Sequence, residues 1–366
     1  MRKHLKTWVE IKESAVKHNV EIFKKLIGPR PKLYAVVKSN AYGHGLLDFS
    51  KLADHYGVNG FCVDSVFEGE KLREAGIKKP ILVLGMTLKD NFPLAARLKL
   101  ILTVSNFAIM QDWLCAKEKP EIHIKVDTGM NRQGFFLNEL PKVIRLVNGQ
   151  ASDVRYRLKG AYTHFASAKD INYPAYTKMQ FAKFLKAVAL FERAGFTDLT
   201  KHCAASGGAM LNPKYHLDMV RVGMGLYGHP PSKEIGIQVP GVKLKPVLAW
   251  KTIVSEVKNV PKGSFISYDL TEKLYRKSRV AVIPIGYWHG FPWALSNYGE
   301  VKIRGKSARV LGRVTMDVMM VDVTDIPACK PYDMAEIDIM SSSFRARTSH
   351  YEFLTRINPL IERIIV

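Results

Sequence analysis

Lys38 is the residue whose surroundings in this sequence most clearly suggest chemistry. It follows the apolar run Leu33–Val37 and precedes the segment Ser39-Asn40-Ala41-Tyr42-Gly43-His44-Gly45. The run predicts a strand buried on both faces, as in a parallel sheet covered by helices, so Lys38 should lie at the edge of an apolar pocket. Desolvation favours the neutral amine that Schiff-base chemistry requires. The alternative is a lysine that reaches solvent from the rim of a core strand.

The elements that would position Lys38 recur along the first two thirds of the chain. Apolar, strand-like runs lie at 33–37, 60–63, 81–84, 101–104, 122–126, 158–163, 199–205 and 217–222. Helical patterns lie between them, and the clearest one places five apolar residues on one face: Phe181, Phe184, Leu185, Val188 and Phe191. Alternating strand and helix units of this number, within roughly 200–250 residues, predict an α/β fold of the (β/α)8 TIM-barrel type.

The pattern changes after Lys233. Prolines and glycines break the helical rhythm, and strand-like alternation follows at 250–255, 279–283, 301–303 and 319–323. We therefore expect a barrel over residues 12–237 and a mostly antiparallel β domain over residues 238–366. The chain contains no long linker or low-complexity tract.

Polar residues follow the predicted barrel strands at one end. They are Lys125 and Asp127 after the fifth strand, His164 after the sixth, Ser206 after the seventh, and Arg221 with Gly223-Met224-Gly225 at the eighth. Barrel enzymes place their chemistry at the carboxyl ends of the strands, and the loops after the last two strands commonly bind phosphate. Each candidate has an ordinary alternative. His164 could be a core histidine, Arg132 a solvated loop arginine, and Tyr268 and Tyr287 simple aromatic packing.

Composition limits the class of protein. The formal charge is +22, but the lysines and arginines are spread along the chain rather than gathered in one block, so we expect no nucleic-acid partner. The four cysteines form no close pair, which predicts a reducing compartment and no metal site of the zinc-knuckle kind. No apolar run approaches about 20 residues and the N-terminus lacks the apolar stretch of a signal peptide, so we expect a cytoplasmic protein without a membrane partner.

Several motifs, taken together, resemble the alanine racemase family along nearly the whole chain. They are Thr7-Trp8-Val9-Glu10-Ile11, the Lys38 segment, the run from His123 to Arg132, Thr163-His164-Phe165-Ala166, the run from Arg221 to Gly228, Ile285-Gly286-Tyr287, and Gly312-Arg313-Val314-Thr315-Met316-Asp317. The resemblance implies a barrel plus a β domain that residues 1–11 join. It also implies a pyridoxal 5'-phosphate cofactor and a homodimer whose active sites are shared between subunits.

The resemblance also implies roles for single residues. Lys38 would carry the cofactor as an internal aldimine and act as one acid/base group, and Tyr268 of the partner subunit would be the other. Racemisation needs two such groups, because the α-proton leaves one face of a planar carbanion and returns on the other. A tyrosine, with a reference pKa near ~10, serves only if neighbouring cations favour its phenolate, and His164 and Arg221 are the matching neighbours.

The remaining implied roles concern binding. Tyr42 and Tyr351 would hold the phosphate, with Ser206, Gly223, Met224 and Tyr287 around it, and Arg221 would face the pyridine nitrogen. Arg132 and Met316 would bind the substrate carboxylate, while Lys125, if carbamylated, would hold Arg132, and Asp317 would support the site. Two residues depart from the family pattern: Ala205 replaces the usual asparagine and His289 the usual acidic residue.

We therefore expect an isomerase that interconverts L-alanine and D-alanine by two-base proton transfer and supplies D-alanine for peptidoglycan synthesis. The nearest alternative is a racemase of broader specificity, acting on serine or basic amino acids. A fold-related amino-acid decarboxylase is more remote, because Tyr268 and Arg221 argue against it. A non-catalytic cofactor carrier would lack the β domain, and a nucleic-acid-binding protein would need a clustered basic patch.

Overall fold

The computed structural model describes residues 4–168, 170 and 174–366, and the chain divides into two compact units. The barrel unit comprises Ser14–Ala41 and Phe49–Pro246. The β unit comprises the segment up to Glu13, Tyr42–Asp48 and Val247–Val366.

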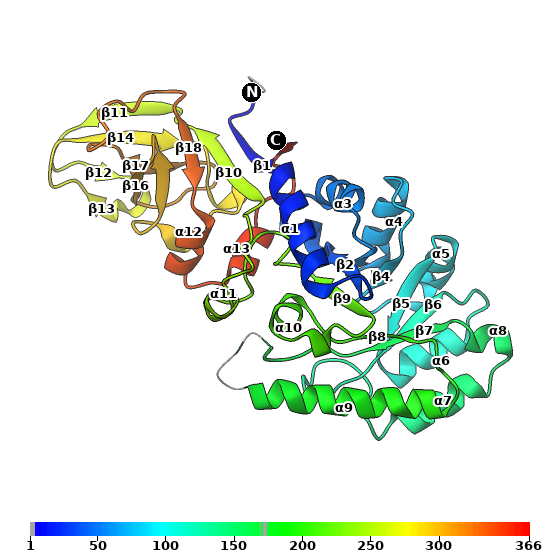
Figure 1. Ribbon diagram of the computed structural model, residues 1–366. Coiled ribbons are helices and arrows are strands. Elements are labelled where there is room, and N and C mark those ends of the chain that lie inside the picture. Colours follow the sequence, from blue (N-terminus) through cyan, green and yellow to red (C-terminus); the bar gives the residue numbers. More distant parts are fainter. Residues whose placement is uncertain (1–3, 169, 171–173) are drawn as a thin grey trace. The chain divides into compact units, whose positions relative to one another are not determined.

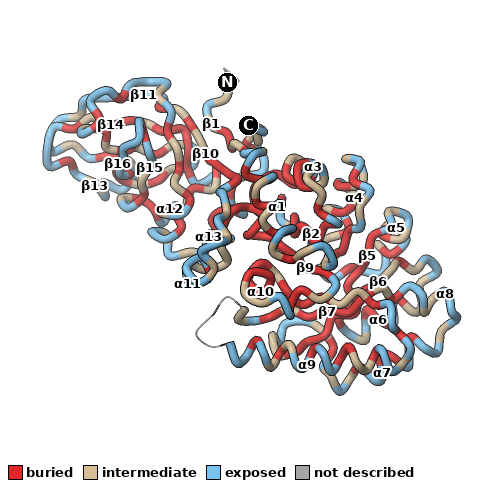
Figure 2. The backbone as a smooth tube through the Cα atoms, viewed as in Figure 1, coloured by how far each residue is buried: buried red, intermediate tan, exposed pale blue. Residues whose placement is uncertain are grey.

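The barrel unit contains eight parallel strands in the order β8-β7-β6-β5-β4-β3-β2-β9. They are β2 (Lys32–Val36), β3 (Gly60–Val63), β4 (Ile81–Val83), β5 (Leu100–Val104), β6 (Glu121–Lys125), β7 (Leu158–Tyr162), β8 (Thr200–His202) and β9 (Met219–Val222). A parallel bridge between Ala205 and Arg221 joins the two ends of the sheet and nearly closes the barrel. The strands are buried almost throughout (Figure 2). The predicted barrel and the approximate positions of its eight strands are confirmed.

Helices follow or precede these strands. They are α1 (Glu13–Ile27), α2 (Lys38–Tyr42), α3 (Leu46–His55), α4 (Val66–Glu74), α5 (Phe92–Arg97), α6 (Phe107–Cys115), α7 (Leu140–Asn148), α8 (Ser152–Arg155), α9 (Pro174–Arg193), α10 (Ser206–Leu211) and α11 (Lys233–Gln238). The predicted apolar face of α9 is correct for Phe184, Val188 and Phe191, which are buried. Leu185 is exposed, because a step of one residue turns it about 100° away from Phe184.

The β unit is built on a nine-stranded sheet in the order β11-β14-β17-β16-β15-β18-β10-β1-β19, which is antiparallel except for the pair β1 and β19. The strands are β1 (Thr7–Ile11), β10 (Leu248–Ile253), β11 (Glu256–Val260), β14 (Ser278–Ile283), β15 (Glu300–Ile303), β16 (Lys306–Leu311), β17 (Met319–Asp322), β18 (Met334–Ile337) and β19 (Arg363–Ile365). The predicted antiparallel β fold is confirmed. The first and last strands lie side by side (Figure 1).

Smaller elements complete the β unit. A two-stranded ribbon pairs β12 (Phe265–Ile266) with β13 (Glu272–Lys273), and two helices follow the sheet, α12 (Ile339–Arg345) and α13 (His350–Thr355). Short 3-10 turns lie at Tyr268–Leu270, Tyr287–His289 and Trp293–Leu295. Within the described part of the chain, no helix combines the length and the apolar character that crossing a membrane would need.

Candidate active site

Lys38 lies just beyond the carboxyl end of β2, as the apolar run predicted, but its surroundings are not apolar. Its Nζ lies 3.0 Å from Oδ1 of Asp64, and its side chain is 35% exposed. Asp64 directly follows β3, so its carboxylate reaches the same edge of the barrel as the amine. An ion pair as exposed as this one contributes little to stability. Its effect is to fix the position of the amine.

The backbone after Lys38 forms a left-handed turn rather than an ordinary loop. Ser39, Asn40, Ala41 and Tyr42 have φ between 51° and 56°. A left-handed conformation costs roughly 1–2 kcal/mol for each residue that has a side chain, so this turn stores on the order of 4–8 kcal/mol. Strain of this kind persists only where the surroundings over-determine it, and it is concentrated at functional sites.

Glu68 on α4 binds the backbone on both sides of the Lys38–Asp64 pair, at Ser39 and at Asp64. Its Oε1 accepts a hydrogen bond from the Ser39 amide at 2.7 Å, and its Oε2 accepts one from the Asp64 amide, also at 2.7 Å. One carboxylate therefore ties the strained turn to the residue that pairs with Lys38. Neither Asp64 nor Glu68 was predicted as a site residue from the sequence.

Arg221, at the end of β9, is only 2% exposed and has no carboxylate partner among the described residues. It donates to Nδ1 of His202 and to the Thr163 carbonyl oxygen at 2.9 Å. It also donates to Nδ1 of His164 at 3.3 Å and to the Cys203 carbonyl oxygen at 3.5 Å. The guanidinium also lies over the Tyr162 ring, 5.0 Å from its centroid. The charge is thus solvated by carbonyls, imidazoles and an aromatic face.

A line of histidines extends this network into the barrel. Because Nδ1 of His202 accepts from Arg221, a neutral His202 carries its proton on Nε2, which lies 2.9 Å from Nδ1 of His123 and donates to it. Burial lowers the pKa of His123 to about 3, with Arg221 adding to the shift, and it lowers the pKa of His202 as well. These imidazoles are therefore neutral at neutral pH.

His164 is also neutral, which corrects the expectation that it acts as a cation. Burial lowers its pKa to about 3, and the positive charges of Arg221 and Arg132 add to that shift. His164 can therefore offer a hydrogen bond but no positive charge, and the positive charges nearest to it are those of Arg221, Arg132, Lys125 and Lys38.

Lys125 lies at the end of β6 in an environment that disfavours its charge. Burial lowers its pKa to about 8, and the nearby guanidinium groups of Arg132 and Arg221 lower it further than Asp127 raises it. Its Nζ donates to Oε1 of Gln133 at 3.2 Å. The neutral amine, which is the form that reacts with carbon dioxide, is therefore more populated near neutral pH than in an ordinary lysine.

Asp127 shapes the loop that carries Arg132. Its Oδ1 accepts hydrogen bonds from the amides of Gly129 and Asn131 at 2.8 and 3.1 Å, and its Oδ2 accepts one from the Arg132 amide at 3.1 Å. The carboxylate thus folds the loop back on itself while the Arg132 side chain remains exposed.

Ser206 and the glycine loop after β9 form a cluster of backbone donors. The amides of Gly223 and Gly225 point at Oγ of Ser206, at 3.2 and 3.3 Å, and Met224 between them is buried. Converging amides of this kind form anion-binding concavities. Ala205 precedes α10, and no side chain caps this helix.

In the β unit, Tyr42 and Tyr351 lie together. Their ring centroids are 6.0 Å apart and their planes are inclined at 58°. Burial raises the pKa of Tyr351, so its phenol keeps its proton and can donate a hydrogen bond to an anion. The structure thus brings together two residues that lie more than 300 positions apart in the sequence.

Tyr268 occupies a second strained turn and is 69% exposed. Ser267 before it has φ 66° and ψ −166°, a region that residues other than glycine rarely enter, and Asp269 after it has φ 61°. Two contacts with Arg313 hold the turn. Oγ of Ser267 donates to the Arg313 carbonyl oxygen at 2.8 Å, and Nε of Arg313 donates to Oδ2 of Asp269 at 3.2 Å.

Tyr287 and Met316 lie on two loops of the β unit that are joined through their backbones. The Tyr287 amide donates to the Thr315 carbonyl oxygen and the Trp288 amide to that of Met316, both at 3.0 Å. His289, which replaces the usual acidic residue, is buried and its Nδ1 accepts from the Gly286 amide at 3.2 Å. It therefore braces the Tyr287 turn, whereas Asp317 is exposed.

The candidates therefore form one set in the barrel unit and another in the β unit. Sequence reasoning missed Asp64, Glu68, His123, His202 and Gln133. Asp64 follows a predicted strand, so the rule that selected Lys38 could have selected it, whereas His202 lies inside the predicted strand 199–205 and that rule does not point to it. Across the residues that the structure describes, no group of three or more His, Cys, Asp or Glu side chains could hold a metal ion.

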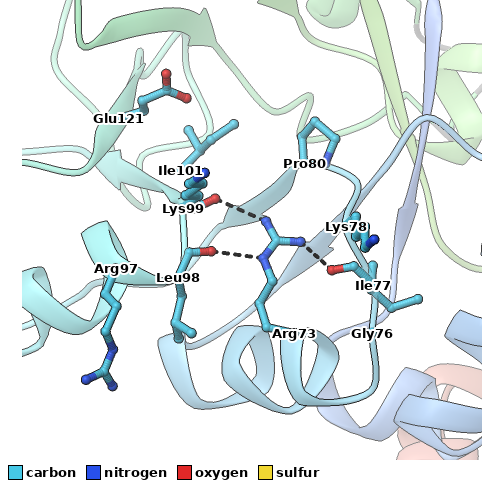
Figure 3. A pocket seen from close by; sticks show the side chains of 10 residues that line it. All are labelled: Arg73, Gly76, Ile77, Lys78, Pro80, Arg97, Leu98, Lys99, Ile101 and Glu121. Atoms are coloured by element: carbon cyan, nitrogen blue, oxygen red, sulfur yellow. Dashed lines mark hydrogen bonds between the residues drawn. The ribbon is translucent and has the colours of Figure 1, made fainter.

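A cavity of about 630 Å³ lies at the opposite end of the barrel strands (Figure 3). Pro80 and Lys99, which precede β4 and β5, contribute to its wall. Arg73 projects into it, but its guanidinium donates to carbonyl oxygens of Leu98 at 2.9 Å and of Ile77 at 2.7 Å. This end of a barrel usually serves stability rather than chemistry, and Arg73 fits that role.

Comparison with known proteins shows similarity along the whole chain. The family model described as "Alanine racemase, N-terminal domain" matches residues 11–231, and that described as "Alanine racemase, C-terminal domain" matches residues 247–365. The alanine racemase of Desulforamulus reducens is 35% identical over 98% of both chains, and that of Halothermothrix orenii is 36% identical over 98% of this chain and 96% of its own.

Solved structures give the same result. An alanine racemase of Clostridium difficile 630 superposes with a TM-score of 0.93 at 30% identity, covering 100% of this chain and 97% of its own. The alanine racemase of Bacillus anthracis with bound L-Ala-P has a TM-score of 0.92, also at 30% identity, and covers 100% of this chain and 96% of its own.

Proposed function

Because this chain belongs to the alanine racemase family, we propose that it interconverts L-alanine and D-alanine with pyridoxal 5'-phosphate and supplies D-alanine for peptidoglycan synthesis. The observation that carries the proposal is the barrel rim. At this rim, Lys38 carries an amine at the start of a strained turn. Arg221, also at the end of a barrel strand, carries a buried guanidinium that has no carboxylate partner among the described residues.

The donors on the barrel unit fit this cofactor. Lys38 offers the amine that condenses with an aldehyde. Ser206 Oγ accepts from the amides of Gly223 and Gly225, and its hydroxyl proton can be donated to a phosphate oxygen. Arg221 Nε makes no hydrogen bond to any described residue, and a guanidinium can only donate, so it matches an unprotonated pyridine nitrogen. When bound, the cofactor withdraws electrons from the bond between the substrate's Cα and its proton and so makes that proton removable.

The protein's own residues then decide which reaction follows. Lys38 Nζ would exchange a proton on one face of the substrate, and the Tyr268 phenol would do so on the other. Arg132 would bind the substrate carboxylate from a loop that Asp127 shapes. Arg221 would disfavour protonation of the ring nitrogen, since two adjacent cations repel, and this favours return of the proton to the substrate rather than to the cofactor.

We also propose that the protein acts as a homodimer in which Tyr268 serves the partner's barrel. In the β unit, Tyr268 and Met316 are 69% and 53% exposed, and Leu270, Tyr287 and Trp293 of the same unit are exposed too. A large exposed apolar surface of this kind typically marks an interface. All four cysteines are free thiols, which suits the cytoplasmic location that we propose.

The function is tested by coupled detection of D-amino acids over a panel of L-amino acids, with protein reconstituted with the cofactor. We expect L-alanine to give the highest kcat/KM. A higher value for L-serine or L-lysine would show a racemase of different specificity. Release of carbon dioxide without any D-amino acid would show a decarboxylase and refute the proposal.

A further inference from the structure

Arg363, on the last strand β19, uses all of its hydrogen-bond donors on backbone carbonyls. Nε and Nη2 donate to the Gly43 oxygen at 3.2 and 2.9 Å, Nη1 donates to the oxygens of Asn358 at 2.8 Å and of Ile361, and Nη2 also donates to that of Ile357 at 3.4 Å. A guanidinium has five N–H donors, and these bonds occupy all five. Arg363 therefore has no donor left for an anion.

Burial lowers the pKa of Arg363 to about 10, so the group remains a cation at neutral pH. The planar fork of a guanidinium fixes the directions of its bonds in a way that a lysine does not. Arg363 thus acts as a rigid brace between the chain at 357–361 and the segment Tyr42–Asp48, which belongs to the same unit.

Gly43 is pressed against α13 on its other side. Its φ is +85°, and a Cβ at this position would lie 2.1 Å from the Leu354 carbonyl oxygen, so no side chain fits. Leu354 lies three residues after Tyr351, on the same helix. The contacts of Gly43 with Leu354 and Arg363 therefore fix the backbone next to Tyr42 against the helix that carries Tyr351. They provide the support that the left-handed conformation of Tyr42 needs, since its φ is 52°.

We propose that Arg363 is a positioning residue for the cofactor phosphate: by holding the Gly43 carbonyl it keeps the Tyr42 phenol beside that of Tyr351, so that both can donate to one phosphate monoester. The inference rests on the proposed function, in which these two tyrosines bind the phosphate. Arg363 acts through the backbone and never touches the anion.

The test compares two ligands that differ only in the phosphate. Dissociation constants of pyridoxal 5'-phosphate and of pyridoxal are measured by absorbance on the apoprotein, for the wild type, Arg363→Met, Arg363→Lys and Tyr42→Phe. We expect Tyr42→Phe and Arg363→Met each to weaken binding of the phosphorylated ligand about tenfold and to leave pyridoxal within about twofold. Arg363→Lys should fall between wild type and Arg363→Met, because three donors replace five.

Arg279 on β14 provides a matched control. Its Nη1 donates to the Ile326 and Pro327 carbonyl oxygens and its Nη2 to that of Cys329, so it braces backbone in the same unit but away from Tyr42. Arg279→Met should lower the melting temperature without a phosphate-specific loss. If Arg363→Met does not fold, Arg363→Lys carries the same comparison.

The outcomes separate the inference from the function beneath it. If Tyr42→Phe shows the phosphate-specific loss but the Arg363 variants weaken both ligands equally or neither, Arg363 only stabilises the fold and the inference is wrong. If Tyr42→Phe shows no phosphate-specific loss, the assignment of Tyr42 to the phosphate fails, and the positioning role falls with it. Neither result would bear on whether the wild type racemises alanine, which the assay of D-amino acids tests separately.

Discussion

The two units present their candidate residues in opposite ways. In the barrel unit, Arg221 and Lys125 are buried, and burial and mutual charge change the proton affinities of Lys125 and His164. In the β unit, Tyr268 and Met316 are more than half exposed, on loops that a few hydrogen bonds hold in place. Burial within the barrel unit therefore sets the charge states of its candidate residues, whereas solvent surrounds most of the Tyr268 side chain.

This difference suggests a division of labour. A group whose charge state is set by burial needs no partner, because desolvation acts as soon as the chain folds. An exposed phenol gains catalytic character only when cations approach it, and Arg221 is the buried cation that lacks an anionic neighbour among the described residues.

The largest effect is expected from Lys38→Ala. It should abolish the link that borohydride reduction traps between protein and cofactor, and lower kcat/KM by more than about 10⁴-fold, because one residue supplies both attachment and proton transfer. Lys125→Ala is the matched control at the same rim and should keep the reducible link. Peptide mass spectrometry that maps the reduced adduct to another lysine would overturn the assignment.

Tyr268→Phe should lower racemisation by about 10²–10⁴-fold, the range of a lost general acid or base, while the cofactor spectrum stays unchanged. The loss should also differ between the two enantiomers of alanine. Exchange of solvent deuterium into D-alanine, which we assign to Lys38, should outlast exchange into L-alanine, which we assign to Tyr268. Equal loss of both exchanges with the cofactor still bound would argue against the separate roles.

The same comparison shows what the sequence could predict. The strand before Lys38 and the buried face of α9 were predictable, because the relevant burial follows the period of a single element. The four consecutive left-handed residues were not, since Ser39-Asn40-Ala41-Tyr42 contains no glycine to mark them. They depend in part on Glu68, which is far from them in sequence.

The position of a site residue could be predicted where the residue follows a strand. Its charge state could not be predicted, because contacts with residues distant in the sequence determine it. The motif located His164, but its neutral state follows from burial next to Arg221, which a local pattern does not reveal. The apolar surroundings expected for Lys38 are not found, because Asp64, which directly follows the neighbouring strand β3, pairs with the amine. Long-range contacts of this kind arise from the closure of the barrel.

The proposed sharing of active sites between subunits predicts that two inactive variants complement each other. If each active site combines Lys38 of one subunit with Tyr268 of the other, as we propose, mixing Lys38→Ala with Tyr268→Phe should restore activity, because each mixed dimer would hold one site with both lesions and one with neither. With random pairing about half the dimers are mixed and each has one intact site, so recovery should approach roughly a quarter of wild type. If native mass spectrometry shows subunit exchange and activity stays absent, Tyr268 acts within its own chain or not at all.

The smallest effect tests the burial that distinguishes the barrel unit, through the pH dependence of its stability. His123 has a pKa of about 3 in the folded chain, against about 6.5 for an unfolded histidine. Between these values the unfolded state binds more protons, so the free energy of unfolding should fall as pH drops below about 6.5, by roughly 1 kcal/mol per pH unit for this histidine. His123→Asn keeps an acceptor for His202, and its urea unfolding between pH 6 and 4 should show a slope shallower by about that amount. His55→Asn, at an exposed position, should keep the wild-type slope. A wild-type slope in His123→Asn would mean that His123 is solvated or charged in the folded protein, and the contrast between the two units would then lose its physical basis.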